Sequence, residues 1–317
     1  MRTVLLEQDS LGEDLDFSPL HLPELDFVAY PATAPEQARE RIADAEVVMV
    51  NKLPLTAELL AGASHLRLIC VVATGTNNID LAAAAERGIA VCNCRGYGTN
   101  SVAQHVLALM LALSVRLWDY QKAVLAGAWQ RADQFCLLDY PIKELNGGTL
   151  GIVGYGELGH RVAELASGFG MRVVVARRPG AEDERPDRLP LDELLGRVDV
   201  LSLHCPLTES TRGLIGAREL GLMKRGSLLV NAARGGIVDE SALADALRRG
   251  HLGGAGVDVL TEEPPRSGNP LLAGDIPNLI VTPHCAWGSR EARQCIVEQT
   301  AENIRGFLEG AAVRRVL

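Results

Sequence analysis

The sequence predicts an α/β protein with two doubly wound parallel-sheet domains. At 317 residues the chain exceeds the usual size of one hydrophobic core. Short apolar runs alternate with helical patterns along most of its length, which is typical of parallel strands joined by helical crossovers. Of its residues, 47% are apolar and only 4% are aromatic, so we expect aliphatic cores.

The first alternation occupies about a hundred residues and predicts a first domain. The apolar runs that we expect to be strands are 4–6, 27–30, 47–50, 68–72 and 89–92. Helical patterns such as Ala34–Ala45 and Leu81–Arg87 separate them. The amphipathic pattern Glu291–Leu308 comes too late for the second alternation, so we assign residues 1–99 and 287–317 to the first domain.

A strongly apolar helix is predicted from Val102 to about Leu117. At its start, Ser101 and Gln104 have the spacing of a capping box. The apolar residues leave no broad polar face, so we expect this helix to be buried, either in a core or between subunits.

The alternation restarts at Thr149 and predicts a second domain, residues 100–286. Its six predicted strands are 150–153, 172–176, 198–204, 227–231, 255–259 and 279–282. Six strands of this kind match a dinucleotide-binding sheet of the Rossmann type.

Glycines follow the first strand of this second domain in the pattern G-x-G-x-x-G. Gly154, Gly156 and Gly159 stand between a strand and a helix, where they permit a tight turn, close approach of a pyrophosphate and close helix packing. We therefore expect a dinucleotide at this helix N-terminus, in contact also with Glu157 and Leu158. The apolar stripe predicted to face the sheet is Leu158, Val162, Leu165 and Phe169.

Composition and charge exclude several classes of partner. A net charge of −9 gives no general attraction to nucleic acid or to an anionic membrane. The longest apolar run, Val106–Val115, is too short to span a bilayer, and the N-terminus has no run of signal-peptide length. Seven cysteines without a C-x-x-C spacing indicate free thiols in a reducing compartment, and no metal centre is predicted. We expect a cytoplasmic protein.

Three charged side chains follow successive strands of the second domain. Arg234, Glu263 and His284 lie just past the strands that end at 231, 259 and 282. Ligands of open α/β sheets bind at this carboxyl edge. An arginine can clamp a carboxylate, a histidine can transfer a proton near neutral pH, and a carboxylate can favour the imidazolium and orient the ring. Singly, each residue also has an ordinary structural role; together they predict an acid–base site.

These motifs resemble the D-isomer-specific 2-hydroxyacid dehydrogenases over nearly the whole chain. The motifs that carry the resemblance are Gly154–Gly159, Asn231–Gly235, Gly256–Val259 leading to Glu263–Pro265, and Thr282–His284. Those that point to the glycerate dehydrogenase and hydroxypyruvate or glyoxylate reductase branch are Asn51–Leu55, Val71–Asn77, Gly96–His105 and Cys285–Trp287.

The resemblance implies roles for particular residues. Arg234, Glu263 and His284 become the catalytic three, and the backbone at Thr74 and Gly75 becomes a donor to the substrate carboxylate. The loop with Lys52 and Leu53 shapes the substrate pocket of a flavodoxin-like first domain. The further cofactor contacts that it implies are Cys205, Pro206, Thr211, Ala232 and Asp258. It also implies a homodimer, with the 100–145 region in the interface.

Two arginines depart from the usual pattern of an NAD site. Such a site has a carboxylate about twenty residues beyond the glycines to accept the ribose hydroxyls. Here the strand ends in Arg177 and Arg178, which cannot accept a hydrogen bond but can fork onto a 2′-phosphate. We therefore expect NADP to be preferred over NAD; the alternative is that both arginines are solvated and that both cofactors serve.

The expected activity is NAD(P)-dependent reduction of hydroxypyruvate or glyoxylate to D-glycerate or glycolate, with His284 as general acid and base. One alternative is a D-2-hydroxyacid dehydrogenase for another substrate, such as D-lactate or an aromatic lactate. A second alternative, from a different class, is a nucleotide-sensing corepressor-like protein that acts by binding other proteins.

Overall fold

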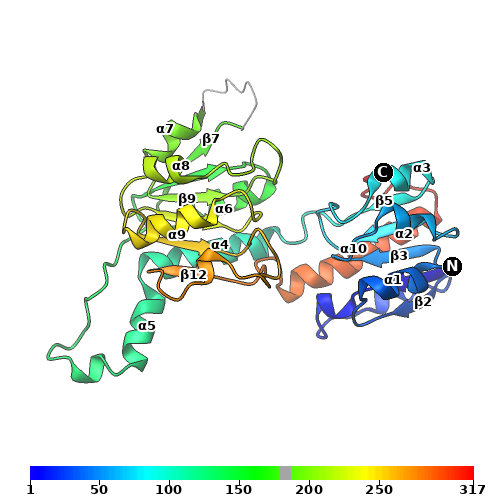
Figure 1. Ribbon diagram of the computed structural model, residues 1–317, viewed down its shortest axis with the longest axis horizontal. Helices are drawn as coiled ribbons and strands as arrows, with labels where there is room; N and C mark the ends of the chain where they lie inside the picture. The colour runs from blue at the N-terminus through cyan, green and yellow to red at the C-terminus, as the bar shows by residue number, and fades with distance from the viewer. Residues whose placement is uncertain (179–186) are drawn as a thin grey trace. The chain divides into compact units, whose positions relative to one another are not determined.

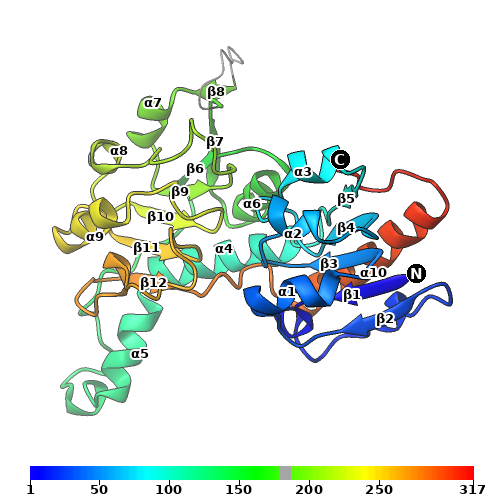
Figure 2. The same cartoon turned by 45° about the vertical axis from the view of Figure 1, so that its right-hand side comes forward.

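The computed structural model describes residues 1–178 and 187–317. The chain divides into two compact units, Met1–Gly98 with Gly288–Leu317, and Thr99–Trp287 (Figures 1 and 2). Each unit contains one sheet whose strands all pair in parallel. The predicted fold class, two doubly wound parallel sheets, is therefore confirmed.

The first unit has a five-stranded sheet in the order β2-β1-β3-β4-β5, the flavodoxin-like order. Its strands are β1 (Arg2–Leu5), β2 (Asp26–Ala29), β3 (Val47–Val50), β4 (Leu68–Val71) and β5 (Ala90–Cys92). Its α-helices are α1 (Pro35–Ile42), α2 (Ala57–Ala61), α3 (Leu81–Glu86) and α10 (Arg290–Leu308). Ile42 and Leu60 pack with the strands in one core cluster, and α10 packs against β4.

The second unit has a seven-stranded sheet in the order β12-β11-β10-β9-β6-β7-β8. Counted from β6 this is the Rossmann order, with β12 added at one edge. Its strands are β6 (Thr149–Val153), β7 (Arg172–Ala176), β8 (Arg188–Leu189), β9 (Val200–Leu203), β10 (Leu228–Asn231), β11 (Gly254–Val257) and β12 (Leu279–Val281). The six predicted strands are present, and β8 is additional because two residues make no recognisable apolar run.

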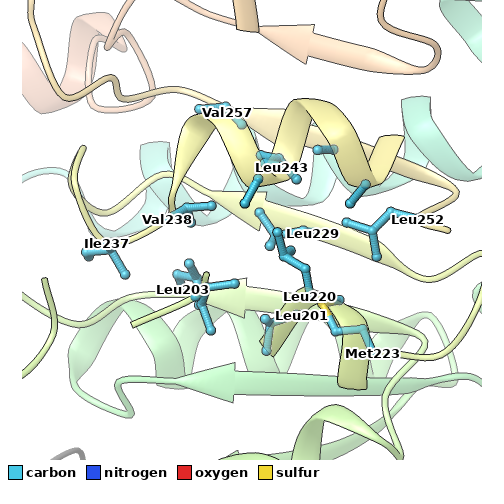
Figure 3. Packing of buried hydrophobic residues seen from close by; sticks show 14 of the residues in the cluster. Leu201, Leu203, Leu220, Met223, Leu229, Ile237, Val238, Leu243, Leu252 and Val257 are labelled. Carbon is cyan, nitrogen blue, oxygen red and sulfur yellow. The ribbon is translucent and has the colours of Figure 1, made fainter. Parts of the chain in front are cut away.

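Helices cover both faces of the second sheet. They are α4 (Thr99–Ser114), α5 (Leu117–Leu125), α6 (Glu157–Gly168), α7 (Leu191–Leu195), α8 (Ala217–Leu222) and α9 (Glu240–Arg248). One core cluster joins α7, α8 and α9 to the strands, and a separate cluster joins α4 and α6 to them. In Figure 3, Leu243 of α9 and Leu220 of α8 lie beside Leu201 and Leu229 of the strands.

Helix α4 starts earlier than predicted, and the predicted cap at Ser101 is wrong. Ser101 lies inside the helix, and its Oγ donates to the Ala286 carbonyl at 2.7 Å. The helix ends at Ser114, shortly before Arg116 turns the chain with a φ of 55°. Its buried residues are Val102, Ala103, Val106, Leu107, Leu109, Met110, Leu113 and Ser114. The core of its own unit thus accounts for its apolar sequence.

Helix α6 buries Val162 of the predicted stripe together with small residues that were not predicted. Its buried residues are Gly159, Val162, Ala163 and Ala166. Leu158 and Leu165 are half-buried, while Phe169 lies beyond the helix end and is 46% exposed. Helix α4 packs against α6. Where two helices pack closely, only small residues such as alanine and glycine fit at the contact.

Exposed apolar residues gather on residues 115–142, which comprise the turn before α5, α5 itself and the loop after it. This segment stands away from the rest of its unit in both views (Figures 1 and 2). Its large exposed apolar side chains are Val115, Leu117, Trp118, Leu125, Trp129, Phe135, Leu138 and Ile142. We call this set the α5 apolar surface.

Within the described residues no single helix is long and apolar enough to cross a membrane. Taken together, α4 and α5 reach that length and composition, but the chain bends by 60° between them.

Candidate active site

The glycine loop lies where the strand order of the second sheet reverses, between β6 and β9. Gly154 follows β6 with a φ of 93°, and a Cβ there would come within 2.5 Å of the Cys205 nitrogen. A Cβ on Gly159 would overlap the Gly154 carbonyl, so this glycine lets α6 approach its own strand. A Cβ on Gly156 would meet nothing within 4 Å. Gly154 and Gly159 therefore serve the fold, and open space lies over Gly156.

The two residues after Gly156 begin α6 in different environments. Glu157 Oε1 accepts a hydrogen bond from Thr99 Oγ1 at 2.6 Å, so its carboxylate is held by the start of α4. Leu158 packs partly buried against the cluster of α4 and α6. Open space over Gly156 at a helix N-terminus fits the pyrophosphate of a dinucleotide.

The arginines after β7 are exposed at the carboxyl edge of the sheet. Arg177 Nε donates to the Arg188 carbonyl at 3.3 Å, and Arg178 follows it directly. The Arg188 guanidinium lies 6.0 Å from the ring centre of Tyr155, in the glycine loop. Sequence reasoning missed Tyr155 and Arg188, because β8 was not predicted and nothing in the sequence places it beside the loop.

The residues that follow β9 and β10 continue the carboxyl edge of the sheet next to the glycine loop. Cys205 and Ala232 are buried, Pro206 is exposed, and burial raises the pKa of the Cys205 thiol. Thr211 Oγ1 donates to the Pro206 carbonyl and accepts from the Thr208 amide, each at 2.7 Å. The Thr211 hydroxyl therefore holds this turn in shape.

Arg234 is positioned by a turn that Asn231 closes. The Asn231 side chain accepts from the Ala233 amide at 3.1 Å and donates to the Arg234 carbonyl at 3.0 Å. Arg234 Nη1 donates to the Ala233 carbonyl at 2.7 Å. Within residues 1–178 and 187–317, the guanidinium pairs with no carboxylate. Its remaining donors are available to an acidic ligand.

Gly235 brings the loop after β10 against the loop after β11. A Cβ at Gly235 would overlap the Leu260 carbonyl, so only glycine allows this approach. The Leu260 amide in turn donates to Glu263 Oε1 at 2.8 Å. One backbone contact thus links the Arg234 turn to the residue that fixes Glu263.

Glu263 joins His284 through its other oxygen. His284 Nδ1 lies 2.6 Å from Glu263 Oε2, and both side chains are partly exposed. A carboxylate only accepts, so Nδ1 carries the hydrogen. In the part of the chain that is described, Nε2 makes no hydrogen bond. His284 can therefore exchange a proton with a ligand at Nε2.

The His284 loop is wrapped around Asp258, at the end of β11. The Asp258 carboxylate is 1% exposed and accepts from the Thr282 hydroxyl at 2.6 Å and from the amides of Cys285 and Ala286 at 3.0 Å. The His284 amide donates to the Asp258 carbonyl at 2.7 Å. His284 itself has a φ of 51°, which this network maintains.

The other predicted substrate residues belong to the first unit. The amides of Lys52 and Leu53 donate to the Glu7 carboxylate, and the Leu53 side chain is buried in the core. Thr74 and Gly75 follow β4, and in residues 1–178 and 187–317 neither amide has an acceptor. The Thr74–Gly75 turn therefore offers free backbone donors, whereas the Lys52 and Leu53 amides are already used.

The chain is similar in sequence to known 2-hydroxyacid dehydrogenases. A model of the D-isomer specific 2-hydroxyacid dehydrogenase NAD binding domain matches residues 107–286. Glycerate dehydrogenase of Methylorubrum extorquens is 44% identical over 98% of this chain and 96% of its own. Hydroxypyruvate reductase of Blautia hydrogenotrophica is 36% identical over 100% of this chain and 99% of its own.

A solved structure shows the same likeness in three dimensions. The crystal structure of the TT0316 protein from Thermus thermophilus has a TM-score of 0.87 and 35% identity, and the match covers 100% of both chains. Sequence and fold therefore agree over both units. The chain belongs to the family of D-isomer-specific 2-hydroxyacid dehydrogenases, enzymes with a nicotinamide dinucleotide cofactor.

Proposed function

We propose that this enzyme reduces a small 2-keto acid, with hydroxypyruvate and glyoxylate as first candidates, to the D-2-hydroxy acid, and that His284 is its general acid and base. The observation that carries the proposal is the 2.6 Å contact between His284 Nδ1 and Glu263 Oε2. This contact leaves Nε2 as the only ring nitrogen able to give or take a proton.

The paired side chains define the proton's path. In reduction, the charged imidazolium donates from Nε2 to the alkoxide that develops on the substrate, and in oxidation neutral Nε2 accepts that proton. Glu263 stabilises the imidazolium and keeps the hydrogen on Nδ1 of the neutral ring. Its own orientation comes from the Leu260 amide.

Arg234 is assigned to the substrate carboxylate and the neighbouring carbonyl. Its planar fork matches a carboxylate, and charge-assisted hydrogen bonds of this kind are shorter and stronger than neutral ones. The Asn231 turn fixes its backbone. The free amides at Thr74 and Gly75 are assigned to the same carboxylate, which makes the first unit the substrate-binding domain.

The cofactor is assigned to the carboxyl edge of the second sheet. The open space over Gly156 fits its pyrophosphate, and the bound nicotinamide supplies or accepts the hydride. The further contacts that we assign are Glu157, Leu158, Cys205, Pro206, Thr211, Ala232 and Asp258. Arg177 and Arg178, with Arg188 close by, favour a 2′-phosphate, so we propose NADP over NAD.

The substrate side chain is proposed to be small. Two full-length relatives are named glycerate dehydrogenase and hydroxypyruvate reductase. The Leu53 side chain is buried, and the Lys52 and Leu53 amides donate to Glu7. We therefore assign to this loop a role in shaping the substrate pocket and not in donating backbone hydrogen bonds to the substrate.

Steady-state kinetics test the proposal. A panel of hydroxypyruvate, glyoxylate, pyruvate and phenylpyruvate is measured with NADPH and with NADH. We expect the highest kcat/KM for hydroxypyruvate or glyoxylate with NADPH. A clear preference for NADH rejects the cofactor assignment, and a preference for phenylpyruvate favours an aromatic lactate dehydrogenase. Tight cofactor binding without turnover of any keto acid favours the corepressor-like alternative.

We also propose a homodimer formed through the 100–145 region. The α5 apolar surface supports it, because eight large apolar side chains on one projecting segment are unusual at a solvent-exposed face. Sedimentation of the protein and of Trp118→Glu with Leu125→Glu tests it. We expect a dimer that the double variant converts to a monomer, and a wild-type monomer rejects the proposal.

A further inference from the structure

A cluster of metal-ligating atoms lies beside the proposed acid–base pair. His105 Nε2, a carboxylate oxygen of Asp258 and Cys285 Sγ all lie within 4.8 Å of one another. His105 comes from α4, Asp258 follows β11 and Cys285 follows β12, so the fold alone brings them together. The Nε2 to Oδ1 distance is 3.7 Å.

The surroundings of the cluster already hold its carboxylate in place. The amides of Cys285 and Ala286 donate to Asp258, one to each oxygen. The Thr282 hydroxyl donates to Asp258 and lies 3.0 Å from His105 Nε2, so neutral His105 donates to Thr282. Metal-binding carboxylates are commonly oriented by a second layer of hydrogen bonds in this way.

We propose that His105, Asp258 and Cys285 form an inhibitory binding site for Zn²⁺. Imidazole, carboxylate and thiolate are the three ligand types that zinc prefers, and a water molecule would complete the tetrahedron. A thiolate and a carboxylate together neutralise the charge of the ion, which matters because Asp258 is 1% exposed. The thiol selects zinc over magnesium or calcium, which prefer oxygen ligands.

The geometry needs only a small adjustment. Ligand atoms around tetrahedral zinc lie roughly 3.3–3.6 Å apart at ordinary bond lengths. Cys285 is exposed, so its side chain can turn about χ1 to close the remaining distance and admit the ion. The thiol proton passes to solvent as the zinc–sulfur bond forms, and His105 changes to the tautomer with its hydrogen on Nδ1, which frees Nε2 for the ion in place of its bond to Thr282.

Zinc bound at this site should inhibit the enzyme, because the site adjoins the proposed general acid and base. His284 directly precedes Cys285, and the Asp258 network holds its loop. A zinc ion on Asp258 would also oppose binding of the cofactor, to which Asp258 is assigned as a contact, and this effect rests on the function proposed above. Zinc should therefore compete with NADPH.

Cobalt binding tests the site without any need for turnover. Co²⁺ is titrated into the full-length protein, and the near-ultraviolet thiolate-to-cobalt charge-transfer band is followed, with Zn²⁺ as competitor. We expect one equivalent of Co²⁺ to bind to the wild type. The band should be absent in Cys285→Ser, and the affinity for Co²⁺ should be at least tenfold weaker in His105→Gln. Cys136→Ser and Cys295→Ser, which remove the other two thiols that are not fully buried, are the controls and should keep the band.

Enzyme assays then test inhibition. Micromolar Zn²⁺ should inhibit the wild type, EDTA should restore activity, and Cys285→Ser should keep its basal activity while needing at least tenfold more zinc. A charge-transfer band that survives in Cys285→Ser, or equal zinc sensitivity of that variant, overturns the proposal. If the protein reduces no keto acid, the cobalt titration still decides the site on its own.

Discussion

His284 and Glu263 are joined at 2.6 Å, and the second oxygen of Glu263 is held by the Leu260 amide at 2.8 Å. The carboxylate therefore cannot rotate away from the ring without losing a backbone hydrogen bond. This arrangement fixes both the tautomer and the direction of His284, which are the two properties that a general acid and base needs.

Removing the imidazole should abolish most turnover. For His284→Ala we expect kcat to fall by roughly 10²–10⁴-fold, the usual contribution of general acid–base catalysis. Cofactor affinity, measured by fluorescence titration with NADPH, should stay near the wild-type value. Glu263→Gln keeps the shape but loses the charge, so its kcat should fall less than that of His284→Ala. Unchanged turnover of His284→Ala would reject the assignment.

The planar, bidentate geometry of the Arg234 guanidinium should contribute more to kcat/KM than its positive charge does. Arg234→Lys keeps one positive charge but loses bidentate geometry, so kcat/KM for the keto acid should fall by about ten- to a hundredfold. Arg212→Lys is the control and should change kcat/KM little, because Arg212 is an exposed arginine whose guanidinium lies beside Gly236 and has no assigned role in substrate binding. Equal kcat/KM for Arg234→Lys and wild type would show that Arg234 does not clamp the substrate.

The sequence could predict where the three proposed catalytic residues lie because each follows a strand. Parallel neighbouring strands end at one edge of the sheet, so Arg234, Glu263 and His284 were expected to converge after β10, β11 and β12. The glycine spacing between a strand and a helix predicted the loop after β6 to which we assign the cofactor. These predictions use only strand order and local turns.

Contacts between distant loops could not be found in that way. Nothing in the sequence shows that Gly235 meets Leu260, or that His105 of α4 lies beside Asp258. Periodicity also failed at a helix end: it placed Phe169 on the buried stripe, whereas α6 ends at Gly168 and Phe169 is 46% exposed. Such features depend on tertiary proximity and not on any local pattern.

His204 should make the fold sensitive to acid. Burial lowers its pKa from 6.5 to about 4, and Nδ1 has no hydrogen-bond partner in residues 1–178 and 187–317. The unfolded chain therefore binds the proton more readily, so stability is complete above pH 6.5 and is lost as the pH falls towards 4. The loss amounts to about 2 kcal/mol at pH 5.

Thermal unfolding of His204→Gln measures this contribution. The fall in Tm between pH 7 and pH 5 should be smaller in the variant than in the wild type, by roughly 4–8 °C. The Gln amide can still bond Ser202, which lies 2.8 Å from His204 Nε2. Parallel Tm profiles for the two proteins would show that His204 is not responsible.

Gly235 should be needed for both stability and activity. Gly235→Ala places a methyl group on the Leu260 carbonyl, and overpacking of this kind costs about 1–3 kcal/mol. The displaced Leu260 loop would also move Glu263, so Tm and kcat should fall together. Gly221→Ala, in helix α8 with nothing within 4 Å of the added Cβ, is the control and should be neutral or slightly stabilising. Wild-type kcat in Gly235→Ala would break the proposed link between the two loops.

The glycines of the cofactor loop should separate into two kinds. Gly159→Ala would put a Cβ on the Gly154 carbonyl, so it should lower Tm even without nucleotide. Gly156→Ala meets nothing within 4 Å and has a φ of −87°, so the fold should tolerate it. Its methyl group would fill the space that we assign to the pyrophosphate, however, and NADPH affinity should fall at least tenfold. Calorimetry of each variant with and without NADPH distinguishes the two effects. In the described part of the chain no other group occupies the space over Gly156, so the added methyl group can meet only the ligand. Wild-type affinity for NADPH in Gly156→Ala would therefore mean that the pyrophosphate does not approach the backbone there.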